Sequence, residues 1–344
     1  MKTLLKNLFK VAFPFIFGGI ILWWVYRDFD FSQALQALWQ MNWFWMFASW
    51  AFEVLSHVLR GLRWRQTLEP LGVRPRKGNC INAIFFSYAS NFVIPRLGEV
   101  SRCGVLAKYD GVSFTKSLGT VVTERLVDGL ILGAMIFSIL MLQADIFTRF
   151  FNRTGTNLQE IEDFFTSSAF WIMVVCAVAI LALLFFLIRS LSFFQKVRAL
   201  FRNLWEGILS LRKVHNLPLF VFLSVAIWGC YFLQFYLPFF CFNSTAQLSL
   251  PAALTIFAAG SVAVIVPTPN GAGSWHFAII SMMLLYGVPE EEAGSFALIV
   301  HGSQTLMLIL LGVWSLIALP LTNGKRQSAS APVSPQGSQD EAKG

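Results

Sequence analysis

The sequence is poor in charged residues. Only 13% of its 344 residues are Asp, Glu, Lys or Arg, whereas a soluble domain carries roughly 25%. Because 56% of the residues are hydrophobic, the sequence predicts an all-α, polytopic membrane protein. The net charge of +8 does not indicate nucleic-acid binding, since the basic residues fall in particular loops, where they set membrane orientation.

Several chemical motifs are also missing. The five cysteines form no CxxC pair and lie mostly in apolar segments, which argues against disulfides or a metal site and favours small core residues. They are Cys80, Cys103, Cys176, Cys230 and Cys241. The chain has no GxxxxGK[ST] nucleotide loop and no acidic metal motif. We therefore expect no cofactor and no metal.

Long apolar stretches are what the sequence does have, and about six of them can cross a bilayer, which takes roughly 17 to 25 residues. They cover residues 11–26, 43–59, 118–142, 169–188, 217–242 and 293–319. The first has a basic start but no small-residue cleavage site, so we interpret it as an uncleaved helix. Residues 1–321 are expected to form one transmembrane domain, and the composition of 322–344 predicts a disordered tail.

Two further apolar regions are too short to span. Residues 81–94 give about 21 Å of helix at 1.5 Å per residue, and basic connections flank them on both sides. A re-entrant hairpin that breaks at 91–98 satisfies both constraints. The pieces 251–266 and 274–286, separated by "PTPNGAG", predict a second hairpin that enters from the opposite face. Paired interruptions of this kind are typical of inverted-repeat transporters.

Basic residues near the ends of the spans predict the orientation of the chain. Lys2, Lys6 and Lys10 precede the first span, and Lys325 and Arg326 follow the last one. By the positive-inside rule, both termini are expected in the cytoplasm and the protein in the cell (inner) membrane. Residues 189–215 combine basic and apolar positions at helical spacing, which suits an amphipathic helix on the inner leaflet.

Ionisable residues inside a membrane need partners or water, because each costs about 2.5 to 3.5 kcal/mol at a helix centre. The candidate substrate-binding residues around the first break are these ionisable residues together with the polar Asn91: Asn91, Arg96, Glu99, Arg102, Glu124, Arg125 and Asp128. One interpretation is a cationic pocket of three arginines, oriented by the acids, that binds an anionic headgroup through planar guanidinium forks. The alternative is a set of structural ion pairs, including an i, i+3 pair between Arg125 and Asp128.

Glu53, His57 and Arg60 share one helical face at i, i+4 and i+7. Glu53 and His57 are either a proton relay or a buried pair without a transport role. Arg60 is expected to extend toward the membrane surface.

The second break offers glycines and free backbone N–H groups at the start of a half-helix, which favour an anion. Its candidate residues are Asn270, Gly271, Gly273 and His276. A plain structural turn would explain the same residues.

At these residues the chain resembles the lysylphosphatidylglycerol synthase transmembrane-region family, described as flippase-like integral membrane proteins. The matching residues are Asn91, Pro95, Arg96, Gly98, Glu99 and Arg102, then "TERLVD" with Glu124, Arg125 and Asp128, then "PTPNGAG". The similarity covers roughly residues 5–320 and implies lipid translocation between leaflets. We expect a stand-alone member without the aminoacyl-transferase domain. His276 departs from the family pattern, where many relatives have a Glu.

The leading hypothesis is a lipid translocator that moves an anionic or aminoacylated phospholipid or a polyprenyl-linked lipid. An intramembrane enzyme is the alternative. It is either a serine-type hydrolase, with Ser274 as nucleophile and His276 or His301 as base, or a glycosyl- or acyl-transferase that acts on lipid carriers. An accessory subunit that binds a lipid-modifying enzyme is a further alternative. The expected partner is a membrane lipid or lipid-linked substrate, and no nucleic acid.

Overall fold

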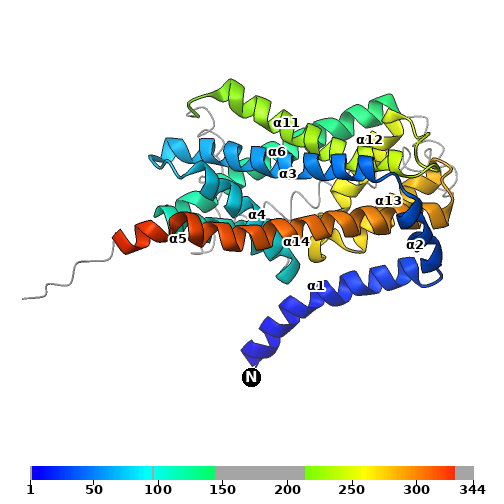
Figure 1. Ribbon diagram of the computed structural model, residues 1–344, viewed down its shortest axis with the longest axis horizontal. Coiled ribbons are helices and arrows are strands. Elements are labelled where there is room, and N and C mark those ends of the chain that lie inside the picture. Colours follow the sequence, from blue (N-terminus) through cyan, green and yellow to red (C-terminus); the bar gives the residue numbers. More distant parts are fainter. Residues whose placement is uncertain (1, 95–96, 144–213, 330–344) are drawn as a thin grey trace, which may run out of the picture.

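A computed structural model describes residues 2–94, 97–143 and 214–329. Every regular element within these ranges is a helix, and the longer helices run along one axis of the molecule (Figure 1). The all-α fold class is therefore confirmed. The elements are α1 Lys2–Tyr26, α2 Phe31–Gln40, α3 Trp43–Leu68, η1 Glu69–Leu71, α4 Lys77–Val93, α5 Leu97–Asp110, α6 Phe114–Leu142, α11 Leu217–Tyr236, η3 Leu237–Cys241, α12 Leu250–Ala263, η4 Pro269–Gly271, α13 Ser274–Leu285 and α14 Glu290–Ala329.

The described helices differ in whether length and composition suit a membrane span. Three are long and apolar enough, at Phe114–Leu142, Leu217–Cys241 and Glu290–Asn323, and two shorter apolar helices lie at Ala12–Tyr26 and Leu250–Ala263. α3 is long but carries charge along its second half. The predicted span at 169–188 and the amphipathic segment at 189–215 lie outside the described residues. α14 continues to Ala329, past the predicted domain boundary at residue 321.

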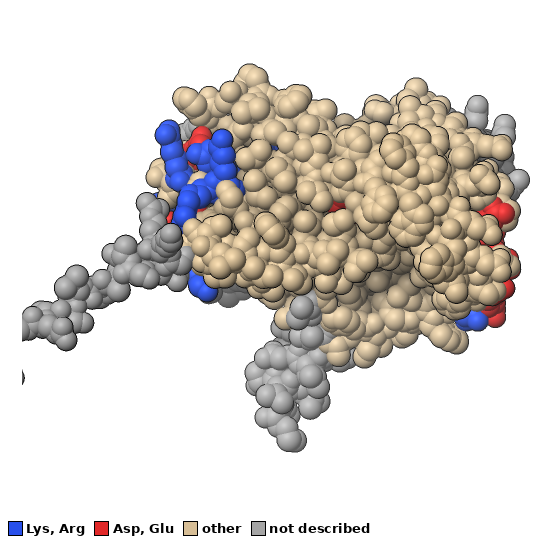
Figure 2. All heavy atoms as spheres, in the orientation of Figure 1, with Lys and Arg blue, Asp and Glu red and all other residues tan. Residues whose placement is uncertain are grey.

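The surface separates apolar from charged residues. In Figure 2 the middle of the molecule shows almost no charged atoms, most of the visible Lys and Arg lie at the left end, and most of the visible Asp and Glu lie at the right end. Large apolar side chains such as Leu130 and Leu142 of α6 and Trp314 of α14 are exposed. Exposed apolar area of this extent marks a surface that contacts lipid rather than water.

The first predicted hairpin consists of α4 and α5, which pack against each other. The chain leaves the helix after Val93 and re-enters it at Leu97, so the break falls within the predicted 91–98. Asn91 Oδ1 accepts a hydrogen bond from Gly98 N–H at 2.8 Å. A Cβ on Gly98 would lie 2.2 Å from Ser87 O, so only glycine lets the two helices approach this closely.

The second predicted hairpin consists of α12 and α13, joined through η4. Its turn places Asn270, Gly271 and Gly273 at positive φ angles of 49°, 76° and 87°. Glycine adopts such angles freely and asparagine tolerates them. The "PNGAG" sequence therefore suits a sharp reversal between two half-length helices.

The two hairpins approach each other from opposite ends of the bundle. Figure 1 has α4 and α5 in its left half and α12 and α13 in its right half. η4, at the tip of the second hairpin, packs against α4 of the first and against α1. α14 contacts both hairpins, through α4 and α13. The half-helices thus meet near the middle of the fold, as the inverted-repeat pattern predicts.

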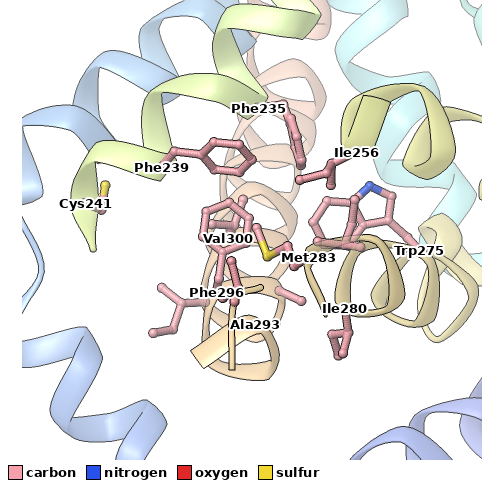
Figure 3. Packing of buried hydrophobic residues seen from close by; sticks show 14 of the residues in the cluster. Phe235, Phe239, Cys241, Ile256, Trp275, Ile280, Met283, Ala293, Phe296 and Val300 are labelled. Atoms are coloured by element: carbon pink, nitrogen blue, oxygen red, sulfur yellow. The ribbon is translucent and has the colours of Figure 1, made fainter. Parts of the chain in front are cut away.

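Two apolar clusters support the hairpins. The one around the second hairpin brings together aromatic and aliphatic side chains of α11, η3, α12, α13 and α14 (Figure 3). It includes Phe235, Phe239, Ile256, Trp275, Met283, Phe296 and Val300. The other cluster holds α4 and α5 against α3 and α6, around the fully buried Trp64. The four described cysteines are buried and free, which confirms them as core residues.

Candidate functional site

Three helices, α3, α5 and α6, bring charged side chains together beside the first hairpin. We call this group the arginine cluster and define it as Arg60 and Arg63 from α3, Arg102 from α5, and Glu124 and Asp128 from α6. Every member is at most 8% exposed. Residues of this type are rarely buried unless they are paired, so α3, α5 and α6 contribute both to this cluster and to the neighbouring apolar cluster around Trp64.

Arg60 lies inside the protein, which corrects the expectation that it extends to the membrane surface. Its guanidinium donates to the hydroxyls of Tyr88 on α4 and Tyr231 on α11, both at 3.0 Å. Asp128 Oδ2 accepts a third hydrogen bond at 3.3 Å. The two tyrosine hydroxyls are themselves 3.0 Å apart. Three neighbouring helices thus satisfy a charge that would otherwise face hydrocarbon.

Arg63 and Arg102 share Glu124. Arg63 Nε lies 3.5 Å from one carboxylate oxygen of Glu124, and an Arg102 terminal nitrogen lies 2.8 Å from the other. Arg63 also donates to Asp128 at 2.8 Å and to Ser224 on α11 at 3.2 Å. The Arg102 guanidinium stacks over the Trp64 ring at 4.5 Å, a contact that suits a desolvated cation.

The arginine cluster carries more positive than negative charge. Its three guanidinium groups face two carboxylates, Glu124 and Asp128. One terminal nitrogen on each of Arg63 and Arg102 has no hydrogen-bond partner among the described residues. An unbalanced positive charge with spare donors, taken out of water, favours the binding of an anion.

A second ion pair lies beside the cluster on the exposed side. Arg125 of α6 hydrogen-bonds Glu99 of α5, and about half of the Arg125 side chain is exposed. Asp128 pairs with Arg60 and Arg63, so the predicted i, i+3 pair with Arg125 is wrong. Arg125 pairs instead with Glu99, which α5 of the first hairpin places beside it. Arg96 lies outside the described residues.

Glu53 and His57 lie on α3 before Arg60 and are buried. Neither Glu53 Oε2 nor either ring nitrogen of His57 has a hydrogen-bond partner within the described part of the chain. The His57 ring packs on Tyr88, with 4.1 Å between ring centroids. The two unpaired ionisable groups therefore lie on the same helix as Arg60, and Tyr88 contacts both His57 and Arg60.

The second break brings Asn270, Gly271, Gly273 and His276 together, with His301 of α14 added. His276 Nδ1 accepts from Gly273 N–H at 3.3 Å, and His301 Nε2 contacts Asn270 O at 3.1 Å. The two imidazole rings are 4.5 Å apart. Both histidines thus contact backbone atoms of the turn and stabilise its conformation.

Ser274 does not form the nucleophile and base arrangement that an intramembrane hydrolase needs. Its hydroxyl lies 3.3 Å from Thr268 Oγ1 and donates to Gly271 O at 3.3 Å. Neither His276 nor His301 hydrogen-bonds Ser274 among the described contacts. The side chain therefore completes the turn, and the geometry gives no support to a serine hydrolase.

Sequence reasoning missed three contributors to the arginine cluster: Arg63, Tyr88 and Tyr231. Arg63 falls in the basic "RGLRWRQ" segment, which the positive-inside rule assigns to a loop. Its spacing from Arg60 was the available signal, because i, i+3 residues share a helical face. Nothing local marks the two tyrosines, since they reach Arg60 from other helices.

Replacing Tyr231 with Phe is expected to lower the free energy of unfolding by about 1 to 3 kcal/mol. The change removes one acceptor from the buried Arg60 guanidinium and one partner from Tyr88. Chemical denaturation in detergent would measure it. Tyr236→Phe on the same helix is the matched control, because the Tyr236 hydroxyl has no hydrogen bond to a described residue. Equal stability for the two variants would contradict the proposed role of Tyr231.

The helical architecture, the apolar middle of the surface and the two broken-helix hairpins define a polytopic α-helical membrane protein. The lysylphosphatidylglycerol synthase transmembrane-region model matches residues 11–312. The chain belongs to this family.

Two curated relatives are similar over parts of their length. A UPF0104 membrane protein of Methanocaldococcus jannaschii is 27% identical over 219 residues, which cover 62% of this chain and 85% of that protein. The glycosyltransferase AglD of Haloferax volcanii is 34% identical over 76 residues, 22% of this chain. The match spans 12% of the glycosyltransferase. No solved structure matches this chain significantly.

Proposed function

We propose that this protein moves a phosphate-bearing lipid between the two leaflets of the cell membrane. The substrate is an anionic or aminoacylated phospholipid or a polyprenyl-linked lipid. The single observation that carries this proposal is the arginine cluster, in which three buried guanidinium groups face two carboxylates beside a broken-helix hairpin. The spare positive charge suits a phosphate group, which all three lipid types contain.

A polar group inside the bundle is what lipid transfer requires. A headgroup cannot cross bare hydrocarbon, because an unpaired polar or charged group there costs several kcal/mol or more. Guanidinium binds phosphate well, since its planar fork makes two parallel hydrogen bonds. The unpartnered nitrogens of Arg63 and Arg102 supply such donors.

The exposed pair of Arg125 and Glu99 suggests a path from the lipid to the arginine cluster. Arg125 follows Glu124 on α6, and Glu99 precedes Arg102 by one turn on α5. The exposed ion pair of Arg125 with Glu99 and the buried ion pair of Glu124 with Arg102 therefore both join α5 to α6. A headgroup that approaches from the lipid side between these helices meets Arg125 first and Arg102 next.

The charge distribution supports an orientation for this path. Basic residues gather at the end of the bundle where α4 begins and α5 ends, and acidic residues at the other end (Figure 2). By the positive-inside rule the basic end faces the cytoplasm, together with both termini. The first hairpin then enters from the cytoplasmic leaflet and the second from the outer one.

An accessory role beside a lipid-modifying enzyme is the second candidate. The similarity to a glycosyltransferase over 76 residues favours it. In that role the chain presents a lipid-linked substrate to an enzyme and does not transfer the lipid alone. Purified protein in vesicles distinguishes the two roles, because an accessory subunit is inactive without its enzyme.

The proposed function predicts that Arg60→Gln slows lipid transfer by about tenfold or more. The change leaves two guanidinium groups for two carboxylates, so the excess positive charge is lost while Asp128 keeps its 2.8 Å contact with Arg63. A lost charge-assisted hydrogen bond is worth about 1.5 to 3 kcal/mol, and 1.4 kcal/mol is a factor of ten. The measurement is transfer of fluorescently tagged phosphatidylglycerol in vesicles of phosphatidylcholine.

Arg65→Gln is the matched control, because Arg65 lies on the same helix and pairs with the partly exposed Glu69. It should transfer lipid at the wild-type rate. Equal rates for Arg60→Gln and Arg65→Gln would contradict the role of the arginine cluster. Inactive wild-type protein in these vesicles would contradict the translocator itself and favour the accessory role.

A further inference from the structure

α3 carries a row of buried polar groups that make no hydrogen bond within the described part of the chain. They are Trp50 Nε1, Glu53 Oε2 and both ring nitrogens of His57. Their spacing of three and four residues places them on one helical face. Glu53 is 1% exposed and His57 is 3% exposed. A carboxyl group and an imidazole kept in this state contribute little to folding, because burial without partners is unfavourable.

The same face continues directly into the arginine cluster. The next residue on it is Arg60, one turn after His57. Tyr88 links the two, since its ring packs on His57 at 4.1 Å and its hydroxyl accepts from Arg60 at 3.0 Å. α3 thus joins the unpaired groups to the anion-binding groups.

Other ionisable groups reach this face of α3 from three helices. α4 contributes Tyr88, α11 contributes Tyr231, and α6 contributes Asp128 through its contact with Arg60. Phe85 of α4 completes the surroundings of His57. On the α14 side, Ser303 donates to Met46 Sδ. Glu53 is the one acidic residue of α3, and no ion pair joins it to an arginine among the described residues.

The charge count makes the protonation of Glu53 and the binding of an anion dependent on each other. The arginine cluster has three positive and two negative groups. With Glu53 ionised, the whole group is neutral. With Glu53 protonated, one positive charge is left over, and a bound monoanion neutralises it. Since unbalanced charge in a buried site is costly, a proton and an anion bind together more readily than either alone.

We propose that Glu53 and His57 form a proton-binding site that couples proton movement to the binding of a phosphate monoanion at the arginine cluster. The inference rests on the proposed function and names the proton as the ion whose movement drives lipid transfer. A hydronium ion donates a proton to a ring nitrogen of His57, and the imidazolium passes a proton on to a carboxylate oxygen of Glu53, so that one O–H bond of hydronium breaks and one O–H bond of the carboxyl group forms. When the headgroup leaves, the carboxyl O–H bond breaks and the proton passes to water on the opposite side of the membrane.

Reciprocity gives a direct test, because a ligand that raises proton affinity must take up protons when it binds. Short-chain phosphatidylglycerol is added to the purified protein in weakly buffered detergent solution with a pH indicator. Tryptophan fluorescence reports lipid binding in the same sample. Wild-type protein is expected to take up about one proton for each lipid bound. Short-chain phosphatidylcholine, which has a phosphate but no net charge, should cause no uptake.

Glu53→Gln is expected to bind the anionic lipid with at least a tenfold loss of proton uptake, and Glu53→Asp should restore the uptake. Glu69→Gln is the matched control, because Glu69 is a partly exposed partner of Arg65. If Glu53→Gln does not fold, His57→Gln is tested instead and should slow the uptake.

The results that overturn the inference can be distinguished from one another. Lipid binding without proton uptake by the wild type, or equal uptake by Glu53→Gln, refutes the coupling and leaves the proposed function intact. Absence of lipid binding by the wild type refutes the proposed function and the coupling together. Inorganic phosphate added alone separates a headgroup site from a site for the free ion. Proton uptake with phosphate but not with phosphatidylglycerol overturns the lipid coupling.

Discussion

Replacing Glu124 with Gln is expected to lower the free energy of unfolding by about 3 to 5 kcal/mol. Glu124 is fully buried and contacts Arg63 and Arg102, at 3.5 and 2.8 Å. Removing one member of a buried ion pair leaves an uncompensated charge in a medium that cannot solvate it. Chemical denaturation in detergent, followed by circular dichroism, measures the loss. A small decrease, near 1 kcal/mol, would mean that water reaches the cluster.

Glu99→Gln is the matched control for this experiment. It removes the same charge from the neighbouring ion pair, in which Arg125 is half exposed. An exposed pair contributes about 0 to 1 kcal/mol, so this variant should keep nearly all of its stability. Arg102→Met combined with Glu124→Leu should recover part of the loss, since buried pairs can often be replaced by apolar side chains.

Replacing Gly98 with Ala is expected to lower the free energy of unfolding by about 2 to 4 kcal/mol. The new Cβ would lie 2.2 Å from Ser87 O and 2.8 Å from Asn91 Oδ1, so α4 and α5 must move apart. Overpacking costs about 1 to 3 kcal/mol, and the lost hydrogen bond from Gly98 N–H costs about 1 kcal/mol more. Denaturation gives the magnitude, and hydrogen exchange locates the opening.

Gly104→Ala on the same helix is the control, because a Cβ there would meet no neighbouring atom of the described residues within 4 Å. It should be neutral or slightly stabilising, since alanine favours the helix more than glycine does. Faster hydrogen exchange confined to α4 and α5 in Gly98→Ala would locate the effect at the hairpin. Unchanged exchange in both variants would contradict the close packing at the break.

The hairpins could be predicted because their signals are local. A short apolar piece, a break rich in Pro and Gly and a second short piece lie in sequence order, and charge on the flanks sets the direction of each. The Asn270 and Gly271 turn is readable for the same reason, since few residues adopt positive φ. The three described helices that are long and apolar enough to span also follow from composition.

The pairing within the site could not be predicted, because it depends on contacts between distant segments. Spacing on one helix favours Arg125 with Asp128, but α5 brings Glu99 closer to Arg125. Arg60 looks like a residue at the membrane surface until Tyr231, far along the chain, is placed beside it. Sequence periodicity identifies a helical face but not what covers it.

α14 constrains how the two hairpins can move when a lipid headgroup enters or leaves the arginine cluster. This 40-residue helix, about 60 Å long, contacts both hairpins. Its Gly312 seats directly on Ala89 of the first hairpin, where a Cβ would lie 2.2 Å from the alanine methyl. A straight helix that contacts both hairpins transmits a displacement of one hairpin to the other. A tilt of either hairpin is therefore expected to move the other one as well, unless α14 bends between its two contacts.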